Sequence, residues 1–221
     1  MSLSAERSVF MRQHMMLITE QVGNMGTNCY LLCNKDTKEA VIIDPGAQGY
    51  LIRDVLENNG MRPVAILLTH GHFDHIDGLE ALKESFHSVK VYASYEEREI
   101  LNDPSTNLST MFGRPCTVLA DEYLQDGDRL ELAGVHFRCI HTPGHTPGGM
   151  CFYAIDDEVL FSGDTLFAGS VGRTDFPGGN GEQLLQSIKE RLADIADYVK
   201  VYPGHGPSTM MEIEREQNPF M

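Results

Sequence analysis

Residues 69–78 have the sequence Thr69-His70-Gly71-His72-Phe73-Asp74-His75-Ile76-Asp77-Gly78. This stretch brings three imidazoles and two carboxylates together in ten residues, directly after an apolar run. Neutral imidazole nitrogens and carboxylate oxygens are the ligands that suit zinc, iron or manganese. Catalytic metal sites also leave one coordination position for water. A histidine-rich surface loop would not need this density, so the stretch predicts a catalytic metal site.

The spacing within the stretch indicates two ions. His70 and His72 lie two residues apart and can bind one ion, while Asp74 and His75 continue past a bend and can reach a second. Three further ligand-type residues follow other strands that the sequence predicts. They are His145 in the turn-rich segment 141–149, Asp164 after a buried strand, and His205 between two glycines.

These seven residues can form two sites. We expect His70, His72 and His145 to make the first site. The second would contain Asp74, His75 and His205. Asp164 would be shared, because a carboxylate has two oxygens and can hold two cations roughly 3.5 to 4 Å apart. His141, at a strand end, is expected to make a structural hydrogen bond instead.

The hydrophobic pattern predicts two similar blocks of strands and helices. In the first block, strands are expected at 15–20, 27–34, 40–44, 64–68 and 89–93, and helices at 46–59, 78–86 and 95–101. In the second block, strands are expected at 116–119, 129–132, 135–141, 150–154 and 158–162, followed by a helix at 182–194 and a strand at 199–202. Two such blocks predict two sheets packed face to face with helices outside, an α/β fold of the four-layer αββα type. We expect one domain over 1–221, with 1–12 as a disordered or artificially added extension.

The composition excludes several classes of partner. Lys and Arg number 17 against 32 Asp and Glu, a net charge of −15, which disfavours nucleic acid and anionic membrane surfaces as partners. The apolar runs are far shorter than the roughly 20 residues that span a bilayer. An odd number of scattered cysteines predicts reduced core residues and a cytoplasmic protein; they are Cys29, Cys33, Cys116, Cys139 and Cys151. We make no prediction of the oligomeric state.

Other titratable residues have ordinary interpretations. His14, His87 and His136 are isolated in the sequence and are expected to be surface or strand residues. The run Glu96-Glu97-Arg98-Glu99 is expected to form a solvent-exposed helix face.

The motif Thr-His-x-His-x-Asp-His, followed in order by His145, Asp164 and His205, resembles the metallo-β-lactamase fold superfamily. The resemblance extends over nearly the whole chain from about Met15. It implies the αββα fold and the same seven ligands. True β-lactamases typically lack a bridging aspartate, so Asp164 disfavours that activity. Members that process nucleic acid usually carry a basic accessory region, which is not seen here.

The run Asp164-Thr165-Leu166-Phe167, with Gly169 and Gly172-Arg173 after it, resembles the glyoxalase II group. This resemblance implies a hydroxyacylglutathione hydrolase-like thioesterase, in a short form without the C-terminal helical domain. The implied substrate is a small-molecule thioester, an S-2-hydroxyacyl thiol such as S-lactoylglutathione. The implied cofactors are two divalent metal ions, zinc first, with iron and manganese as alternatives. Arg173 corresponds to a basic substrate contact, whereas Asp175 stands where an aromatic contact is expected.

The expected mechanism uses a hydroxide that bridges the two ions. Metal binding lowers the pKa of water from 15.7 to roughly 7, which makes the hydroxide a strong nucleophile for the thioester carbonyl. Asp74 would act both as a ligand and as the catalytic group that orients the nucleophile. Thiolate leaves readily, so no strong general acid is needed.

Two alternatives stay open. The pentapeptide Gly172-Arg173-Thr174-Asp175-Phe176 also resembles the persulfide dioxygenases. Their single iron has two histidines and an aspartate, which correspond here to His72 or His70, His145 and Asp164. The other alternative is a metal-bearing thioesterase that acts on the acyl thioester of a carrier protein.

Overall fold

The computed structural model describes residues 12–221. Most of the extension predicted at 1–12 therefore lies outside the described residues. Its last residue, Arg12, belongs to the folded part, because its guanidinium donates to the buried carboxylate of Asp157 at 2.8 Å.

The first sheet has six strands in sequence order. They are β1 (Met15–Val22), β2 (Thr27–Asn34), β3 (Glu39–Ile43), β4 (Arg62–Leu67), β5 (Lys90–Ser94) and β6 (Glu122–Leu124). The first three strands pair antiparallel, and β3 to β6 pair parallel. Parallel neighbours need a long crossover. Helices α1 (Gly49–Asn58) and α3 (Leu79–Ser85) lie in the crossovers that precede and follow β4.

The second sheet also has six strands, in the order β14, β13, β10, β9, β8, β7. Their bounds are β7 (Arg129–Leu132), β8 (Val135–His141), β9 (Met150–Ala154), β10 (Val159–Gly163), β13 (Lys200–Pro203) and β14 (Thr209–Met210). Helices α5 (Gly181–Arg191) and α6 (Met211–Gln217) follow in the second half. A small hairpin, β11 (Leu166–Phe167) with β12 (Ser170–Val171), follows β10.

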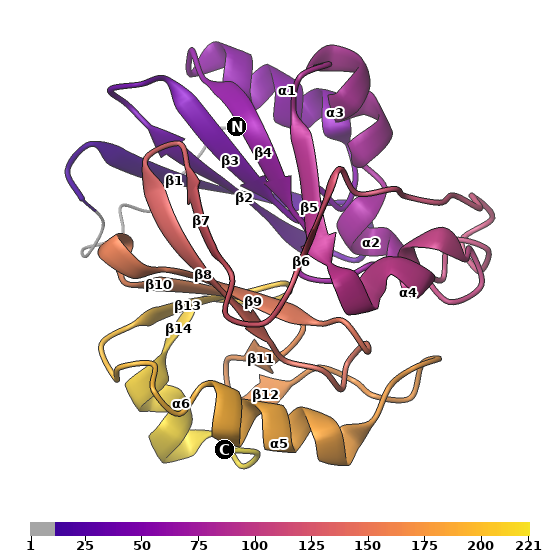
Figure 1. Cartoon of the computed structure of the whole chain (residues 1–221), viewed down its shortest axis with the longest axis vertical. Coiled ribbons are helices and arrows are strands. Elements are labelled where there is room, and N and C mark those ends of the chain that lie inside the picture. The colour runs from indigo at the N-terminus through magenta and orange to yellow at the C-terminus, as the bar shows by residue number, and fades with distance from the viewer. Residues whose placement is uncertain (1–11) are drawn as a thin grey trace.

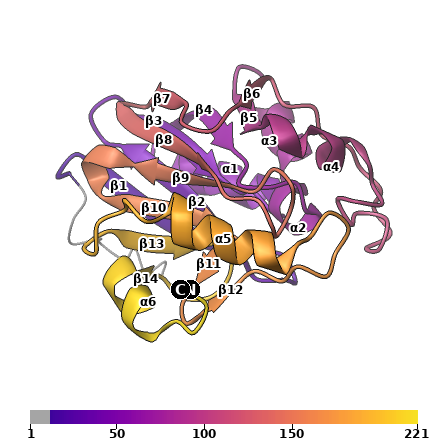
Figure 2. The ribbon, with the colours of Figure 1, turned by 60° about the horizontal axis from the view of Figure 1, so that its bottom comes forward.

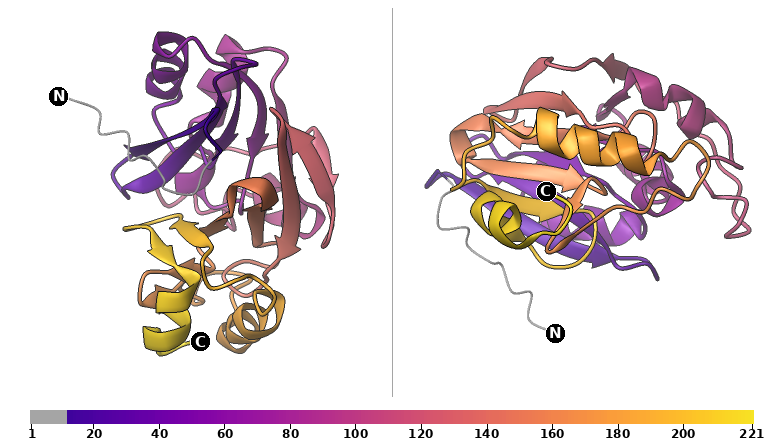
Figure 3. Two further views of the ribbon diagram at one scale, coloured as in Figure 1. Left: turned by 90° about the vertical axis from the view of Figure 1, so that its left-hand side faces the viewer. Right: turned by 90° about the horizontal axis from the view of Figure 1, so that it is seen from below.

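Figure 1 shows the predicted four layers, with α1 and α3 outside the first sheet and α5 and α6 outside the second. Figure 2 shows α5 lying across the outer face of the second sheet, and the side view in Figure 3 shows the two sheets between the helices. The αββα prediction is therefore confirmed.

Strand β2 is buried at every position, and its central run from Cys29 to Cys33 does not alternate with strongly polar residues. Successive side chains of a strand point to opposite faces. Leu31 and Cys33 pack in the core under the helices, whereas Tyr30 and Leu32 pack in the core between the sheets. A strand buried on both faces does not alternate in polarity. Four of the five cysteines are buried in such positions, Cys116 is half-buried, and all five are free thiols, as predicted.

Two predictions of secondary structure were wrong, and one helix was not predicted. Residues 116–119 form no strand; Val118 N donates to Leu101 O instead of joining a sheet ladder, and Leu119 is 73% exposed. The strand that pairs with β5 is β6, slightly later in the chain. The bend expected after His72 is a short helix, α2 (Phe73–Ile76). The C-terminal helix α6 was not predicted.

Three further short helices lie between the strands of the two sheets. Strand β5 leads into η1 (Tyr95–Glu97) and then α4 (Arg98–Asn102), while η2 (Ile155–Asp157) joins β9 to β10. Among residues 12–221, no helix is long and apolar enough to cross a membrane.

Candidate metal centre

The predicted ligands follow the carboxyl ends of strands in both sheets. His70 and His72 follow β4 in the first sheet, while Asp164 and His205 follow β10 and β13 in the second. The carboxyl ends of parallel strands meet at one edge of a sheet, and loops there are common places for a site. The packing of the two sheets brings all seven predicted residues to one place.

His70, His72 and His145 form what we call the three-histidine cluster. Nε2 of His145 lies 3.0 Å from Nδ1 of His72 and 3.2 Å from Nε2 of His70. All three side chains are buried. Burial, with the neighbouring histidines, lowers the pKa of His72 to about 3 and that of His70 well below its usual value. The imidazoles of His70 and His72 are therefore neutral near pH 7 and offer lone pairs rather than protons.

Asp74, His75 and His205 form the mixed cluster. Oδ2 of Asp74 lies 3.2 Å from Nε2 of His205, and Nε2 of His75 lies 3.4 Å from the same nitrogen. Burial alone would lower the pKa of His75, but the nearby carboxylates, first that of Asp74, raise it to about 10. The mixed cluster therefore attracts positive charge, in contrast to its neighbour.

Asp164 lies between the two clusters. Its Oδ2 is 3.6 Å from Nε2 of His145 and 3.6 Å from Nε2 of His205. Its Oδ1 is 3.5 Å from Nε2 of His75. One carboxylate thus contacts residues of both clusters.

Three histidines are oriented through their second ring nitrogen. Nδ1 of His75 donates to Oδ2 of Asp44 at 2.9 Å, and Nδ1 of His145 donates to the main-chain carbonyl of Arg173 at 2.7 Å. Nδ1 of His70 lies 3.2 Å from the hydroxyl of Thr69. Such partners fix the tautomer and leave the other nitrogen, Nε2 in each case, free to bind a metal.

The donor set fits divalent metal ions. The buried Oδ1 of Asp164 accepts no hydrogen bond from any described residue, although a buried carboxylate oxygen normally has a partner. In the three-histidine cluster, Nε2 of His145 also lies within 3.2 Å of a ring nitrogen of each of the other two histidines. A cation would satisfy both features. The three-histidine cluster would hold one ion, the mixed cluster a second, and Asp164 would contribute to both.

The start of β2 supports the mixed cluster. Thr27 donates from its hydroxyl to Oδ2 of Asp74 at 3.0 Å, and Asn28 N donates to the carbonyl of Gly204 at 2.7 Å. A Cβ at Gly204 would lie only 2.2 Å from Oδ1 of Asp164, so the close approach of this loop requires glycine. Gly204 is one of the two glycines that flank His205 in the sequence.

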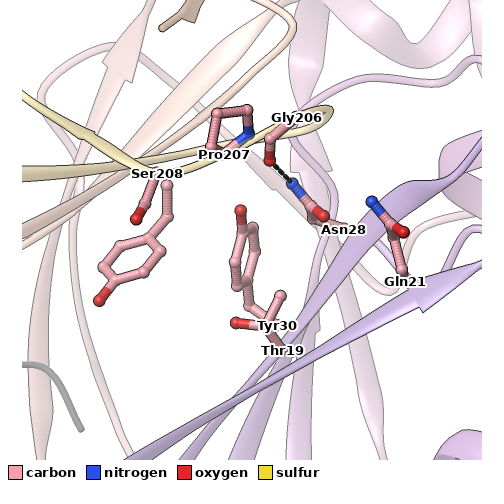
Figure 4. Close-up of a pocket in the computed structure, with 8 residues that line it drawn as sticks. Thr19, Gln21, Asn28, Tyr30, Gly206, Pro207 and Ser208 are labelled. Atoms are coloured by element: carbon pink, nitrogen blue, oxygen red, sulfur yellow. Dashed lines mark hydrogen bonds between the residues drawn. The ribbon is translucent and has the colours of Figure 1, made fainter. Parts of the chain in front are cut away.

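Two cavities flank the centre. One, of about 460 Å³, touches Asp74 and lies between the turn after β1 and the rings of Phe73 and Phe112. The other, of about 410 Å³, lies behind the His205 loop, where Asn28 donates to the carbonyl of Gly206 (Figure 4). Only the first cavity includes a cluster residue in its lining, so it is the better place for a substrate.

Arg173 makes three contacts near the three-histidine cluster. Its main-chain carbonyl orients His145, as described above, while its exposed guanidinium forms two hydrogen bonds with Asp175 at 2.7 Å. The guanidinium also stacks on the ring of Phe176, 4.0 Å from the ring centre. Phe176 in turn packs edge-on against His72. This segment forms one wall beside the cluster.

Sequence reasoning missed two carboxylates near the centre. Asp44 directly follows the buried strand β3, as Asp164 follows β10. An aspartate directly after a buried strand was the signal that identified Asp164, and the same signal could have identified Asp44. Glu97 was predicted to be exposed on a helix face, and this was wrong, because its side chain is fully buried. Burial raises the pKa of Glu97 to about 7, although hydrogen bonds from Gly71, Thr146 and Gly148 oppose the rise.

Comparison with known proteins agrees with the fold. Residues 22–205 match the family described as the Metallo-beta-lactamase superfamily. The probable metallo-hydrolase YqgX of Bacillus subtilis is 41% identical, over 90% of this chain and 94% of its own length. The hydroxyacylglutathione hydrolase GloC of Haemophilus influenzae is 38% identical, over 88% of this chain and 92% of its own.

Solved structures share the architecture. BLEG-1, a B3 metallo-beta-lactamase, has a TM-score of 0.87 at 42% identity and covers 93% of this chain and 99% of its own. The di-iron-bound form of TTHA1623 has a TM-score of 0.82 at 35% identity, covering 92% of this chain and 100% of its own. ETHE1 from Myxococcus xanthus has a TM-score of 0.76 at 28% identity, covering 93% and 84%.

Proposed function

Because the chain belongs to the metallo-beta-lactamase superfamily, we propose that it is a metal-dependent hydrolase of small S-acyl thiol thioesters, of the hydroxyacylglutathione hydrolase kind. The observation that carries this proposal is the position of Asp164, whose two oxygens face residues of both clusters. That arrangement supports a two-metal centre, which suits hydrolysis. The relative named hydroxyacylglutathione hydrolase supports the choice of substrate class.

The metals and the protein would divide the work. Bound divalent ions, zinc first and iron or manganese as alternatives, would supply a nucleophile at neutral pH and polarise the carbonyl. The six cluster residues and Asp164 would hold those ions. Asp74 also lies at the wall of the cavity, where its carboxylate can orient the attacking water by a hydrogen bond. No general acid beside the leaving sulfur is required, since a thiolate leaves without protonation.

The surroundings of the centre support a small substrate. The cavity of about 460 Å³ beside Asp74 can take an acyl thiol, and the apolar rings of Phe73 and Phe112 are next to it. Arg173, on the other side of the centre, would contact an anionic group of the thiol. In the described structure its guanidinium is paired with Asp175, so the substrate would have to compete with that carboxylate. The free thiols support a reducing, cytoplasmic location, which we also propose.

A second candidate is oxidation of a persulfide at a single iron. The similarity to TTHA1623, which was solved in a di-iron-bound form, favours testing iron as the metal. Such an iron would need two histidines and one aspartate, and His70, His145 and Asp164 could supply them. Nε2 of His145 lies 3.2 Å from Nε2 of His70 and 3.6 Å from Oδ2 of Asp164.

One set of assays separates these functions. Protein loaded in turn with zinc, manganese and ferrous iron would be given S-lactoylglutathione, a glutathione persulfide with an oxygen electrode, an acyl carrier protein thioester and nitrocefin. We expect hydrolysis of the small thioester with zinc or manganese, and its absence in the His72→Ala variant. Oxygen uptake that requires iron and persulfide, without thioester hydrolysis, would replace the proposal with the second candidate. Turnover of nitrocefin or of the carrier thioester alone would also overturn it.

A further inference from the structure

One buried carboxylate joins the two loops that carry the three-histidine cluster. Glu97 ends η1, directly after β5 of the first sheet, and its side chain is fully buried. Its Oε1 accepts the main-chain N–H of Gly71 at 2.7 Å. Its Oε2 accepts the hydroxyl of Thr146 at 2.9 Å and the main-chain N–H of Gly148 at 2.8 Å.

These three donors come from the ligand loops themselves. Gly71 stands between His70 and His72 in the loop after β4 of the first sheet, while Thr146 directly follows His145 in a loop of the second sheet. The single carboxylate therefore links ligands that belong to different sheets and lie more than 70 residues apart in the chain.

The fit around Glu97 is tight. A Cβ at Gly148 would lie 2.2 Å from the backbone nitrogen of Glu97, so the loop can approach this closely only with glycine. The other direct link nearby is the main-chain bond from Met150 N to Thr69 O. That bond joins the bases of the two loops, whereas Glu97 joins their ligand-bearing parts.

We propose that Glu97 is the positioning residue that sets the separation of His145 from His70 and His72, and thereby the metal affinity of the three-histidine cluster. It contacts no cluster imidazole, so it acts through the loops. All three partners donate to the two oxygens of Glu97, and a carboxylate is suited to this because it only accepts. In Glu97→Gln, an amide NH₂ would replace one oxygen and leave at least one of the two buried N–H groups without an acceptor.

This inference rests on the metal loading in the proposed function and not on the substrate. The test is a titration of the metal-free full chain with Co²⁺, followed by visible absorption, with metal content measured after desalting. The His72→Ala variant identifies the binding step that belongs to the three-histidine cluster, because it removes that step. The control is Glu99→Gln, an exposed carboxylate of the same segment.

We expect Glu97→Gln to weaken the step that His72→Ala removes by about 10- to 100-fold, the usual effect of losing a group that orients ligands. The other step should change by less than about threefold, and its absorption bands should be unaltered. Thr146→Val, which removes one donor and keeps the side-chain shape, should weaken the same step to a smaller extent. Glu99→Gln should bind like the wild type.

Several outcomes would overturn the inference. In the first, Glu97→Gln leaves Co²⁺ binding at the three-histidine cluster unchanged. In the second, it weakens both Co²⁺-binding steps equally. In the third, His72→Ala removes neither of the two steps seen with the wild type. If Glu97→Gln fails to fold, the same comparison of the two Co²⁺-binding steps is made with Thr146→Val. A wild-type chain that binds a single Co²⁺ would contradict the two-metal part of the proposed function, whereas two steps with no effect of Glu97→Gln would contradict the role of Glu97 alone.

Discussion

Compared with the three-histidine cluster, the mixed cluster is more open and more strongly charged. The His205 side chain is 26% exposed, whereas that of His145 is 4% exposed. The aspartates around His75 raise its pKa, but burial among other imidazoles lowers that of His72. The mixed cluster thus offers a cation an electrostatic attraction, and the three-histidine cluster offers neutral lone pairs held in a fixed arrangement.

The supports of the two clusters differ in the same way. Asp44 accepts three hydrogen bonds, from the Thr69 main chain, the Thr69 hydroxyl and the imidazole of His75, so it contacts a cluster histidine directly. Glu97 also accepts three, but all come from the loops around the histidines. A direct carboxylate partner raises the basicity of its histidine, while an indirect one can only set geometry. This contrast indicates that charge stabilises the mixed cluster and loop position stabilises the other.

The largest expected effect comes from the residue that both clusters share. Asp164→Ala should lower kcat for thioester hydrolysis by about 10³-fold, and metal content should fall at both clusters. Kinetics with matched measurements of bound metal would test this. Full activity with two bound ions in the variant would show that Asp164 is not needed to hold metal at either cluster.

Removing the metal should lower stability, because bound ions act on the folded state only. If the free metal concentration is 100 times Kd, one bound ion raises the free energy of unfolding by about 2.7 kcal/mol. For a chain of this size that corresponds to a fall in Tm of about 5 to 11 °C on chelation. Calorimetry with and without EDTA measures the shift, and the His72→Ala variant should show a smaller one. A Tm that does not respond to chelation would contradict metal binding to the folded chain.

The charge contrast predicts a selective effect of Asp44→Asn. The substitution keeps the size of the side chain but removes its charge and one acceptor, so the mixed cluster should bind its ion about 10- to 100-fold more weakly. Asp44 reaches the three-histidine cluster only indirectly, through the Thr69 hydroxyl beside His70, so the three-histidine step should weaken less, by about threefold or less. In the Co²⁺ titration, Asp44→Asn should therefore weaken mainly the mixed-cluster step, whereas Glu97→Gln should weaken mainly the three-histidine step. Loss of the same step in both variants would show that the two supports are not separate.

The smallest expected effect is at the rim of the three-histidine cluster. Arg173→Ala keeps the main-chain carbonyl that orients His145, so metal content should not change. The exposed guanidinium is already paired with Asp175, which limits its net contribution to substrate binding. We expect KM to rise by about two- to fivefold with kcat nearly constant. A loss of bound metal would instead assign the side chain a structural role.

Much of the centre could be predicted from local sequence alone. The density of histidine and aspartate in residues 69–78, and single ligand-type residues directly after buried strands, identified the seven residues that the fold brings together. The two blocks of strands and helices predicted the sandwich, because side-chain periodicity is a local property of each element. The strand expected at 116–119 failed for a related reason, since alternation of polarity can occur in a loop that has no sheet to join.

The supports of the centre were decided only by the tertiary structure. Glu97 lies in a charged run typical of a solvated helix face, but it is buried between the loop after β4 and a loop from the second sheet. The main-chain carbonyl of Arg173 has no signature in the sequence at all, yet it orients His145. Residue types and periodicity report what a segment can do by itself, so they determined the ligands and the layers. Hydrogen bonds between segments far apart in the chain depend on how the two sheets pack, and that packing alone determined which groups hold the ligands in place.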